Sequence, residues 1–349
     1  MDEMEFRILD TLSRNPDRAV SINALTKEIR QLHDTAHYPN VYKTLHRLNE
    51  DGLVRLTKTG NSSLASLDLE NRQAITALSE MELWKRRFLF ERSAELRRLR
   101  DSVFDDLLIG PISLIDAEGN MKLNRAELLI QLPECPKKAE MTESLLKILG
   151  RLEGRLNLRI DALVLDKADF SSLLAARDRN QLKEMLSRQT SLMAPDIFWS
   201  NIRNAWARGI RIHFDQEETR PDKISEEHIL HNLARFGYKE LGARVRESLD
   251  IGIEYIVTAL LLRGGPRRVS AIPVILAKNR TTYALLLFLA KKYGVQGRLL
   301  GILKAMEKQK TDQDLRNAIR MMEMTQVKEV KFDDARMKKL MRTYDALEA

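Results

Sequence analysis

The sequence has a single cysteine, few aromatic residues, and little glycine or proline. Of 349 residues, one is Cys, 6% are aromatic, 15 are Gly and 9 are Pro, whereas 31% are charged. Cys135 has no second cysteine to pair with, which excludes an internal disulfide and a Cys-x-x-Cys metal site and is typical of a reducing cytoplasm. Sparse Gly and Pro with abundant charge favour helices. We expect a mainly α protein with α+β parts.

Long apolar runs are also missing. The longest, residues 255–262 and 283–290, are far shorter than the roughly 20 residues that span a bilayer. The N-terminus begins with Asp2, Glu3 and Glu5 instead of the basic and then apolar pattern of an export signal. We therefore expect no membrane segment and a cytoplasmic location.

Positive charge is concentrated in one part of the chain. The formal net charge is +8, yet residues 261–310 contain eleven Lys or Arg and a single acid, Glu307. The first 75 residues are close to neutral by the same count. A segment this basic predicts an anionic partner, and nucleic acid is the simplest one.

Periodic apolar residues near the N-terminus predict three helices. The first spans residues 4–14, the second follows a capping residue, Ser21, and the third begins near Pro39 and ends before Gly52. Residues 53–57 and 63–67 have β-type patterns and are joined by residues with hairpin-turn chemistry. The predicted order is therefore three helices followed by a hairpin.

The third predicted helix has an apolar and a polar stripe. The apolar stripe contains Val41, Leu45 and Leu48, and the polar stripe contains Asn40, Lys43, Thr44 and Arg47. With the phrase Leu45-x-x-Leu48-x-x-x-Gly52-Leu53-Val54, this order resembles the winged-helix domains of prokaryotic, archaeal-type transcription regulators over about 70 residues.

The resemblance implies that the third helix enters the major groove of DNA and that the hairpin contacts the backbone or the minor groove. The residues that it implies for DNA binding are Asn40, Lys43, Thr44, Arg47, Lys58 and Asn61. The alternative is a winged helix that serves protein contacts or dimerisation.

The sequence predicts a helical connector over residues 73–106, which is also a candidate dimer surface. An alternation of strands and helices follows over residues 107–215. Expected strands include residues 112–115, 126–131, 158–165 and 209–214, with a helix over residues 140–155. Placed behind a winged helix, this order resembles the minimal nucleotidyltransferase domains of archaea and bacteria. Those enzymes use a Gly-Ser turn for a phosphate and an Asp-x-Asp pair with a third acid for metal.

The sequence departs from that motif. Asp116-Ala117 replaces the turn, Arg125-x-Glu127 replaces the acid pair, and only Asp161 matches the third acid. The resemblance therefore implies a degenerate, catalytically inactive domain without metal or cofactor. The alternative is an active nucleotidyltransferase, acting on RNA or a protein partner, with metal bound by Asp116, Glu127 and Asp161.

Residues 216–349 predict a basic helical domain, with helices that include residues 240–249. The loop Gly264-Gly265-Pro266-Arg267-Arg268 is the conspicuous one. Candidate phosphate or backbone contacts are Arg267, Arg268, Lys291, Lys292 and Arg298. The alternative for the loop is a helix end followed by a surface turn.

The sequence thus predicts a DNA-binding protein, a transcriptional regulator, in four parts: a winged helix (1–72), a helical connector (73–106), a degenerate nucleotidyltransferase-like domain (107–215) and a basic helical domain (216–349). Duplex DNA is the expected partner, and a homodimer would match two half-sites. An RNA-binding or assembly protein is the remaining alternative.

Overall fold

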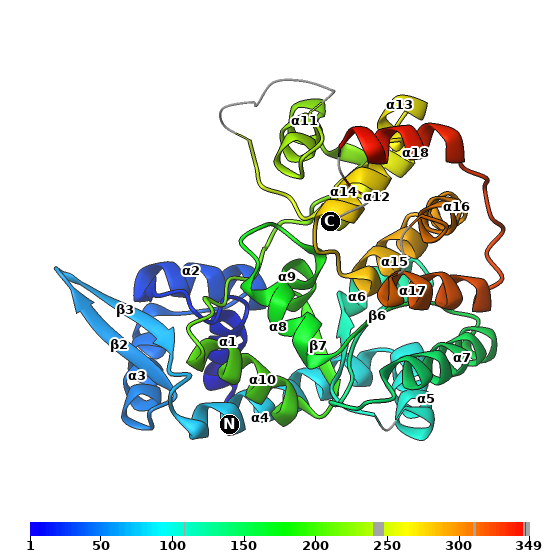
Figure 1. Ribbon diagram of the computed structural model, residues 1–349. Coiled ribbons are helices and arrows are strands. Elements are labelled where there is room, and N and C mark those ends of the chain that lie inside the picture. The colour runs from blue at the N-terminus through cyan, green and yellow to red at the C-terminus, as the bar shows by residue number, and fades with distance from the viewer. Residues whose placement is uncertain (108, 240–247, 310–311, 345, 347–349) are drawn as a thin grey trace. The chain divides into compact units, whose positions relative to one another are not determined.

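The computed structural model describes residues 1–107, 109–239, 248–309, 312–344 and 346 (Figure 1). The described residues are mainly helical and contain two small sheets, which confirms the expected fold class. The chain forms two compact units. The first comprises residues 1–138, 144–175 and 182–217, and the second comprises residues 139–143, 176–181 and 218–349.

The first unit begins with what we call the N-terminal segment, residues 3–67. Its elements are α1 (Glu3–Ser13), β1 (Val20–Ser21), α2 (Ile22–His33), α3 (Tyr38–Glu50), β2 (Val54–Thr59) and β3 (Ser62–Leu67). The three strands form an antiparallel sheet in the order β1-β3-β2. In Figure 1 the β2–β3 hairpin extends away from the three helices.

Local sequence signals set the bounds of these helices. The Ser21 side chain accepts a hydrogen bond from the Ala24 amide at 3.2 Å and caps α2, as expected. Pro39 lies in the first turn of α3, where a missing amide hydrogen has no cost. Gly52 follows α3 with a φ of +68°, a left-handed conformation that glycine adopts without strain.

Two further helices, α4 (Arg72–Arg92) and α5 (Ala94–Asp106), follow the hairpin. They are separated at Ser93, whose hydroxyl accepts from the Leu96 amide at 3.2 Å and caps α5. Helix α4 packs against α1, strand β7 (Gln189–Met193) and helix α10 (Pro195–Ala207). The N-terminal segment and the second sheet of this unit therefore share α4 as a common packing partner.

The second sheet has the strand order β6-β5-β4-β7. Its other strands are β4 (Ile112–Ile115), β5 (Arg125–Gln131) and β6 (Arg159–Leu165), accompanied by helices α6 (Ala117–Lys122), α7 (Lys138–Leu156), α8 (Lys167–Ala175) and α9 (Gln181–Leu186). Strand β4 pairs antiparallel with both β5 and β7, whereas β5 and β6 are parallel. The parallel register places Glu127 beside Asp161.

The strand expected over residues 209–214 is wrong. These residues alternate between buried and exposed, with Ile212 and Phe214 in the core, but they are not part of a strand. The fourth place in the sheet belongs to β7, which buries Gln189, Thr190 and Ser191. Alternation alone reports an extended segment with one face inward, and it does not report a hydrogen-bonded neighbour.

The second unit is helical over its described residues. Its elements are the 3-10 turn η1 (Pro221–Lys223) and helices α11 (Glu226–Arg235), α12 (Ile253–Arg263), α13 (Pro266–Val269), α14 (Ile272–Lys278), α15 (Tyr283–Lys292), α16 (Gln296–Glu307), α17 (Gln313–Met324) and α18 (Asp334–Thr343). The helix expected over residues 240–249 falls largely on residues 240–247, which lie outside the described residues. None of the described helices in either unit combines the length and apolar character needed to cross a bilayer.

Candidate nucleic-acid interface and central charge quartet

Helix α3 presents a polar face to solvent because its apolar residues recur at helical spacing. Val41, Leu45 and Leu48 are each at most 1% exposed. Asn40 and Lys43, on the opposite side, are exposed as the sequence predicts. These two side chains are available to a partner.

The other two residues expected on this face have different surroundings. Thr44 is buried, because it lies directly beside Leu45 and three residues after Val41, at the border of the apolar stripe. Arg47 is half exposed and forms ion pairs with Asp2 and with Glu5, the latter at 2.9 Å. The Arg47 charge is therefore compensated by the first turn of α1.

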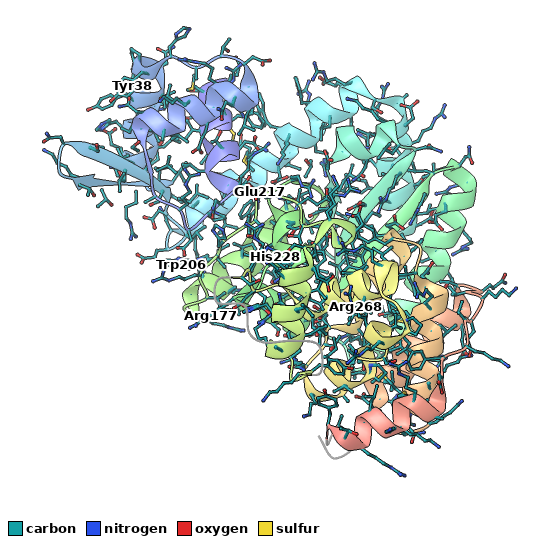
Figure 2. The ribbon with its side chains drawn as sticks, turned by 90° about the horizontal axis from the view of Figure 1, so that it is seen from above. Tyr38, Arg177, Trp206, Glu217, His228 and Arg268 are labelled. Carbon is teal, nitrogen blue, oxygen red and sulfur yellow. The ribbon has the colours of Figure 1, made fainter. Side chains whose placement is uncertain are left out.

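A row of aromatic side chains lies on another exposed face of α3, and the sequence reasoning missed it. Tyr38 and Tyr42 are each 43% exposed and stack with ring centroids 6.0 Å apart, and Tyr42 lies 4.4 Å from the His46 ring. Figure 2 labels Tyr38 on this segment. The signal was the i, i+4, i+8 spacing of the three rings, which places them on one helix face.

A shallow cavity of about 450 Å³ separates α3 from the start of α1. Its lining residues are Asp2, Glu3, Met4, Arg7, Asn40, Lys43, Thr44 and Arg47. The α1 side carries the carboxylates of Asp2 and Glu3 together with Arg7, and the α3 side carries amide, hydroxyl and cationic groups. Arg47 is paired with Asp2 and Glu5, whereas Lys43, one turn earlier, is exposed.

The β2–β3 hairpin carries the remaining candidate contacts. Lys58 pairs with Ser63 in the strand register, Gly60 adopts a φ of +57° in the turn, and Asn61 follows it. Lys58 and Asn61 are both exposed near the tip. Arg55, nearer the base of the hairpin, is held by Asp68 at 3.1 Å and Glu70 at 3.0 Å.

Four charged side chains form a quartet on one face of the second sheet. Side chains two apart on a strand share a face, so Arg125 lies beside Glu127 on β5 and Arg159 beside Asp161 on β6. The parallel register pairs Arg125 with Arg159 and Glu127 with Asp161. Sequence reasoning named three members and missed Arg159, although Arg-x-Glu and Arg-x-Asp are the same pattern on two strands.

Arg125 lies between the two carboxylates of this quartet. Its guanidinium is 2.9 Å from Glu127 Oε1 and 2.7 Å from Asp161 Oδ2, and Asp161 also lies 3.1 Å from Arg159 Nε. The Asp161 side chain is fully buried and that of Glu127 is 5% exposed. Two cations thus balance two anions, and Arg159 is the member of the quartet whose side chain is substantially exposed, at 47%.

A divalent ion between these carboxylates would meet the guanidinium. Two unit charges about 4 Å apart interact by about 4 kcal/mol at an effective dielectric of about 20, so a divalent ion would face roughly twice that repulsion. Among the described residues, no three His, Cys, Asp or Glu side chains are grouped so as to hold a metal ion.

The third residue of the alternative metal set, Asp116, is placed at the start of α6. It has a φ of +42°, and its amide donates to the Arg188 carbonyl at 3.1 Å. A Cβ added at Gly119 would lie 2.5 Å from an Asp116 carboxylate oxygen, so this glycine makes room for that side chain. Gly119 lies within α6, and the residues after β4 form a helix where a phosphate turn would stand.

The basic C-terminal residues are mostly used within their own unit. Arg268, labelled in Figure 2, is paired with Glu226, and Lys292 is paired with Glu218 at 3.0 Å with its side chain only 7% exposed. Arg298 donates to the Leu261 carbonyl. Arg267 is exposed and Lys291 is half-buried, and both take part in intramolecular interactions. Gly264 ends α12 and Gly265 is the N-cap of the short helix α13, so these two glycines join two helices.

A buried charge cluster joins the N-terminal segment to α4. Asp10 of α1 is 2% exposed and lies 3.1 Å from Lys85 and 3.3 Å from both Arg14 and His33. Burial alone would raise the pKa of Asp10, but these neighbours, Lys85 foremost, hold it below its usual value. Asp10 is therefore ionised at neutral pH and depends on its cations.

Helix α4 also carries three exposed large apolar side chains, one of which, Trp84, contacts Phe6 of α1 with ring centroids 6.2 Å apart. Leu83, Trp84 and Phe88 are 43%, 46% and 57% exposed. Charged residues lie near them: Glu80 precedes Leu83 in the sequence, and Arg87 directly precedes Phe88. Exposed large apolar side chains grouped on one helix mark an interaction surface more often than scattered ones do.

Comparison with known proteins identifies no relative of this chain. No protein-family model, curated protein sequence or solved structure matches the chain.

Proposed function

We propose that the protein is a cytoplasmic DNA-binding transcriptional regulator whose N-terminal segment acts as a winged helix. The observation that carries this proposal is the exposure of Asn40 and Lys43 on α3 together with Lys58 and Asn61 at the hairpin. These are hydrogen-bonding and cationic side chains of the kinds that contact base edges and phosphates.

The dimensions of α3 suit this role. A helix of 13 residues is about 20 Å long, and a major groove about 12 Å wide admits one helix. In the proposed complex Asn40 and Lys43, in the first half of α3, face base edges, and the hairpin places Lys58 against the backbone. Arg47 contributes less, because DNA would have to displace Asp2 and Glu5.

In this proposal the second sheet has no catalytic role. The Arg125 guanidinium takes the position between Glu127 and Asp161 where a metal-dependent nucleotidyltransferase would need a cation. The sheet serves instead as the support on which α4 and the N-terminal segment are mounted. Transfer of a labelled nucleotide to RNA or protein by the purified chain would contradict this part.

RNA binding is a second candidate, and the aromatic row on α3 favours it. Exposed tyrosines stack on unpaired bases, which is the common mode of recognising single-stranded RNA. Tyr38 and Tyr42 present such surfaces beside Lys43. Competition between duplex DNA, single strands and structured RNA at fixed salt distinguishes the two candidates.

A second copy of the chain is the proposed partner for the apolar face of α4. In an antiparallel pair of these helices, Trp84 packs near Leu83 of the other copy, and Glu80 comes opposite Arg87. Both charges have a partner within their own chain, Glu80 the N-terminal amino group and Arg87 the nearby Glu91, and both side chains are exposed. Such pairs contribute under about 1 kcal/mol and exchange readily. A two-fold dimer would present two α3 helices to two half-sites.

Titration of a labelled duplex at low salt tests the main proposal. We expect the affinity for duplex to fall as the salt concentration rises. In the double variant Lys43→Ala, Lys58→Ala the plot of log affinity against log salt should be shallower, with a slope smaller in magnitude by about 1.8. The matched control is Lys338→Ala, Lys339→Ala, which removes two exposed charges from α18. Absence of binding to any duplex at low salt would refute the proposal.

A further inference from the structure

The second unit contains a cavity of about 240 Å³ that the proposed DNA contact does not use. Its lining residues are Pro266, Val269, Ser270, Arg298, Ile302, Val330, Lys331, Phe332, Asp333 and Arg336. They come from α13 and its C-cap residue, from α16, from the segment that leads into α18, and from the first turn of α18. Three cations and one carboxylate therefore meet at a cavity with otherwise largely apolar walls.

The three cations of the cavity differ in their hydrogen bonding and in their exposure. The Arg298 guanidinium donates a hydrogen bond to the Leu261 carbonyl, which fixes its position. Its remaining N–H groups can donate to a ligand. Lys331 is exposed and Arg336 is half-buried. The lone carboxylate, Asp333, is already engaged as the cap of α18, accepting from the amides of Ala335 at 3.1 Å and Arg336 at 3.2 Å. The cavity thus carries a net positive charge.

The segment that carries Val330, Lys331 and Phe332 is held in place for a steric reason. The chain at residues 328–330 lies so close to α16 that a Cβ at Gly301 would overlap the Val330 carbonyl, and the Val330 amide donates to the Gly297 carbonyl at 3.0 Å. This close approach holds Val330, Lys331 and Phe332 at the edge of the cavity. Val269 and Ile302 supply buried apolar surface on the other side.

We propose that this cavity binds a small organic phosphate, with the phosphate between Arg298, Lys331 and Arg336 and an apolar or aromatic body against Val269, Ile302 and Phe332. Two guanidiniums suit a phosphate because their planar forks can donate paired hydrogen bonds to its oxygens. The apolar walls favour an ester over free phosphate, since the body of the ester removes apolar surface from water. The inference goes beyond DNA binding and does not depend on it.

Calorimetric titration of the full chain with phenyl phosphate, inorganic phosphate and phenol tests the inference. We expect phenyl phosphate to bind at least tenfold more tightly than inorganic phosphate, and phenol to give no measurable heat. Arg336→Gln should weaken phenyl phosphate at least tenfold, whereas Lys338→Gln, an exposed position on the same helix, should leave it unchanged.

A second variant separates the two halves of the site. Phe332→Ser should weaken phenyl phosphate several-fold and leave inorganic phosphate unchanged, because it removes only an apolar wall. No binding of phenyl phosphate to the unmodified chain, or equal losses in Arg336→Gln and Lys338→Gln, would overturn the inference. A loss of duplex affinity in Arg336→Gln as large as its loss for phenyl phosphate would also overturn it, because the phosphate would then come from nucleic acid.

Discussion

Lys43 and Arg125 are both cations that the sequence analysis singled out, Lys43 as a DNA contact and Arg125 as the replacement of a metal ligand, but they have opposite surroundings. Lys43 is exposed on α3. Arg125 is 16% exposed and lies between two buried carboxylates. The first can be used by a partner and costs the fold nothing, whereas the second holds the fold together and is closed to partners. Charge in a sequence becomes a binding signal only when the fold leaves it unpaired.

The basic C-terminal region extends this contrast. Residues 261–310 have a large excess of cations in sequence, yet Arg268, Lys292 and Lys304 are paired with acids that lie outside that range. The near-neutral N-terminal segment, in comparison, leaves Lys43 and Lys58 exposed. Net charge over a sequence segment is therefore a poor measure of the charge that a partner meets.

The largest expected effect follows the removal of Arg125. Arg125→Ala leaves Glu127 and Asp161 buried without their shared cation, which should lower the free energy of unfolding by about 3 to 5 kcal/mol. Denaturant titration measures the change. The triple variant Arg125→Met, Glu127→Gln, Asp161→Asn removes the charges together and should recover most of the loss. Equal stability of Arg125→Ala and the unmodified chain would contradict the pairing.

Glu254 is a buried acid that differs from Glu127 and Asp161, because no cation is among the groups that shift its pKa. Glu254 is 5% exposed, and burial raises its pKa to about 7, opposed by the hydrogen bond from the Thr282 amide at 2.8 Å. Because the folded chain keeps this proton longer than the unfolded chain, the free energy of unfolding should fall as pH rises from about 4.5 to about 7, by on the order of 3 kcal/mol from this group.

Comparison of pH profiles isolates the Glu254 contribution. Glu254→Gln mimics the protonated acid and keeps an acceptor for the Thr282 amide, so it should flatten the profile between pH 5 and 8 and stabilise the protein most at the alkaline end. Thermal melts of both proteins across this range measure the difference. Parallel profiles for the two proteins would show that Glu254 does not titrate in this range.

The exposed cations should affect binding without affecting stability. Lys43→Ala should lower duplex affinity about tenfold at low salt, on the order of 1.4 kcal/mol, and leave the melting temperature unchanged, because its side chain is not part of the core. Fluorescence anisotropy and thermal melts of the same samples provide both readouts. A melting temperature that falls together with affinity would mean that Lys43 has a structural role.

The smallest expected effect is that of Arg47. Its ion pairs with Asp2 and Glu5 are exposed, so Arg47→Ala should reduce duplex affinity less than Lys43→Ala does, by roughly twofold, and change stability by under about 1 kcal/mol. The same anisotropy titration ranks the two variants. An Arg47→Ala loss larger than that of Lys43→Ala would place the contact at the C-terminal half of α3.

Local patterns allowed much of the fold to be predicted. The cap at Ser21, Pro39 in the first turn of α3, Gly52 after it, and the strands beginning near residues 112, 126 and 159 all follow from residue type and periodicity. Strand β7 could not be predicted, because its buried polar residues have no apolar alternation and its place depends on pairing with β4.

The candidate site was predictable only where one helix determines it. Exposure of Asn40 and Lys43 follows from the periodicity of α3 alone. Burial of Thr44, pairing of Arg47 with α1, and the quartet around Arg125 all need elements that are distant in sequence to come together. Partner choice among charges is a tertiary property, which explains why sequence reasoning listed cations without separating the paired from the unpaired ones.

The Asp10–Lys85 contact limits where this chain can be divided into fragments. A fragment ending at residue 72 would keep the carboxylate in α1 and lose the amine that faces it, leaving a buried anion with only Arg14 and His33 near it. Moving the N-terminal segment to another scaffold therefore requires α4 as well, because α4 supplies the Lys85 ammonium group that compensates the buried charge of Asp10.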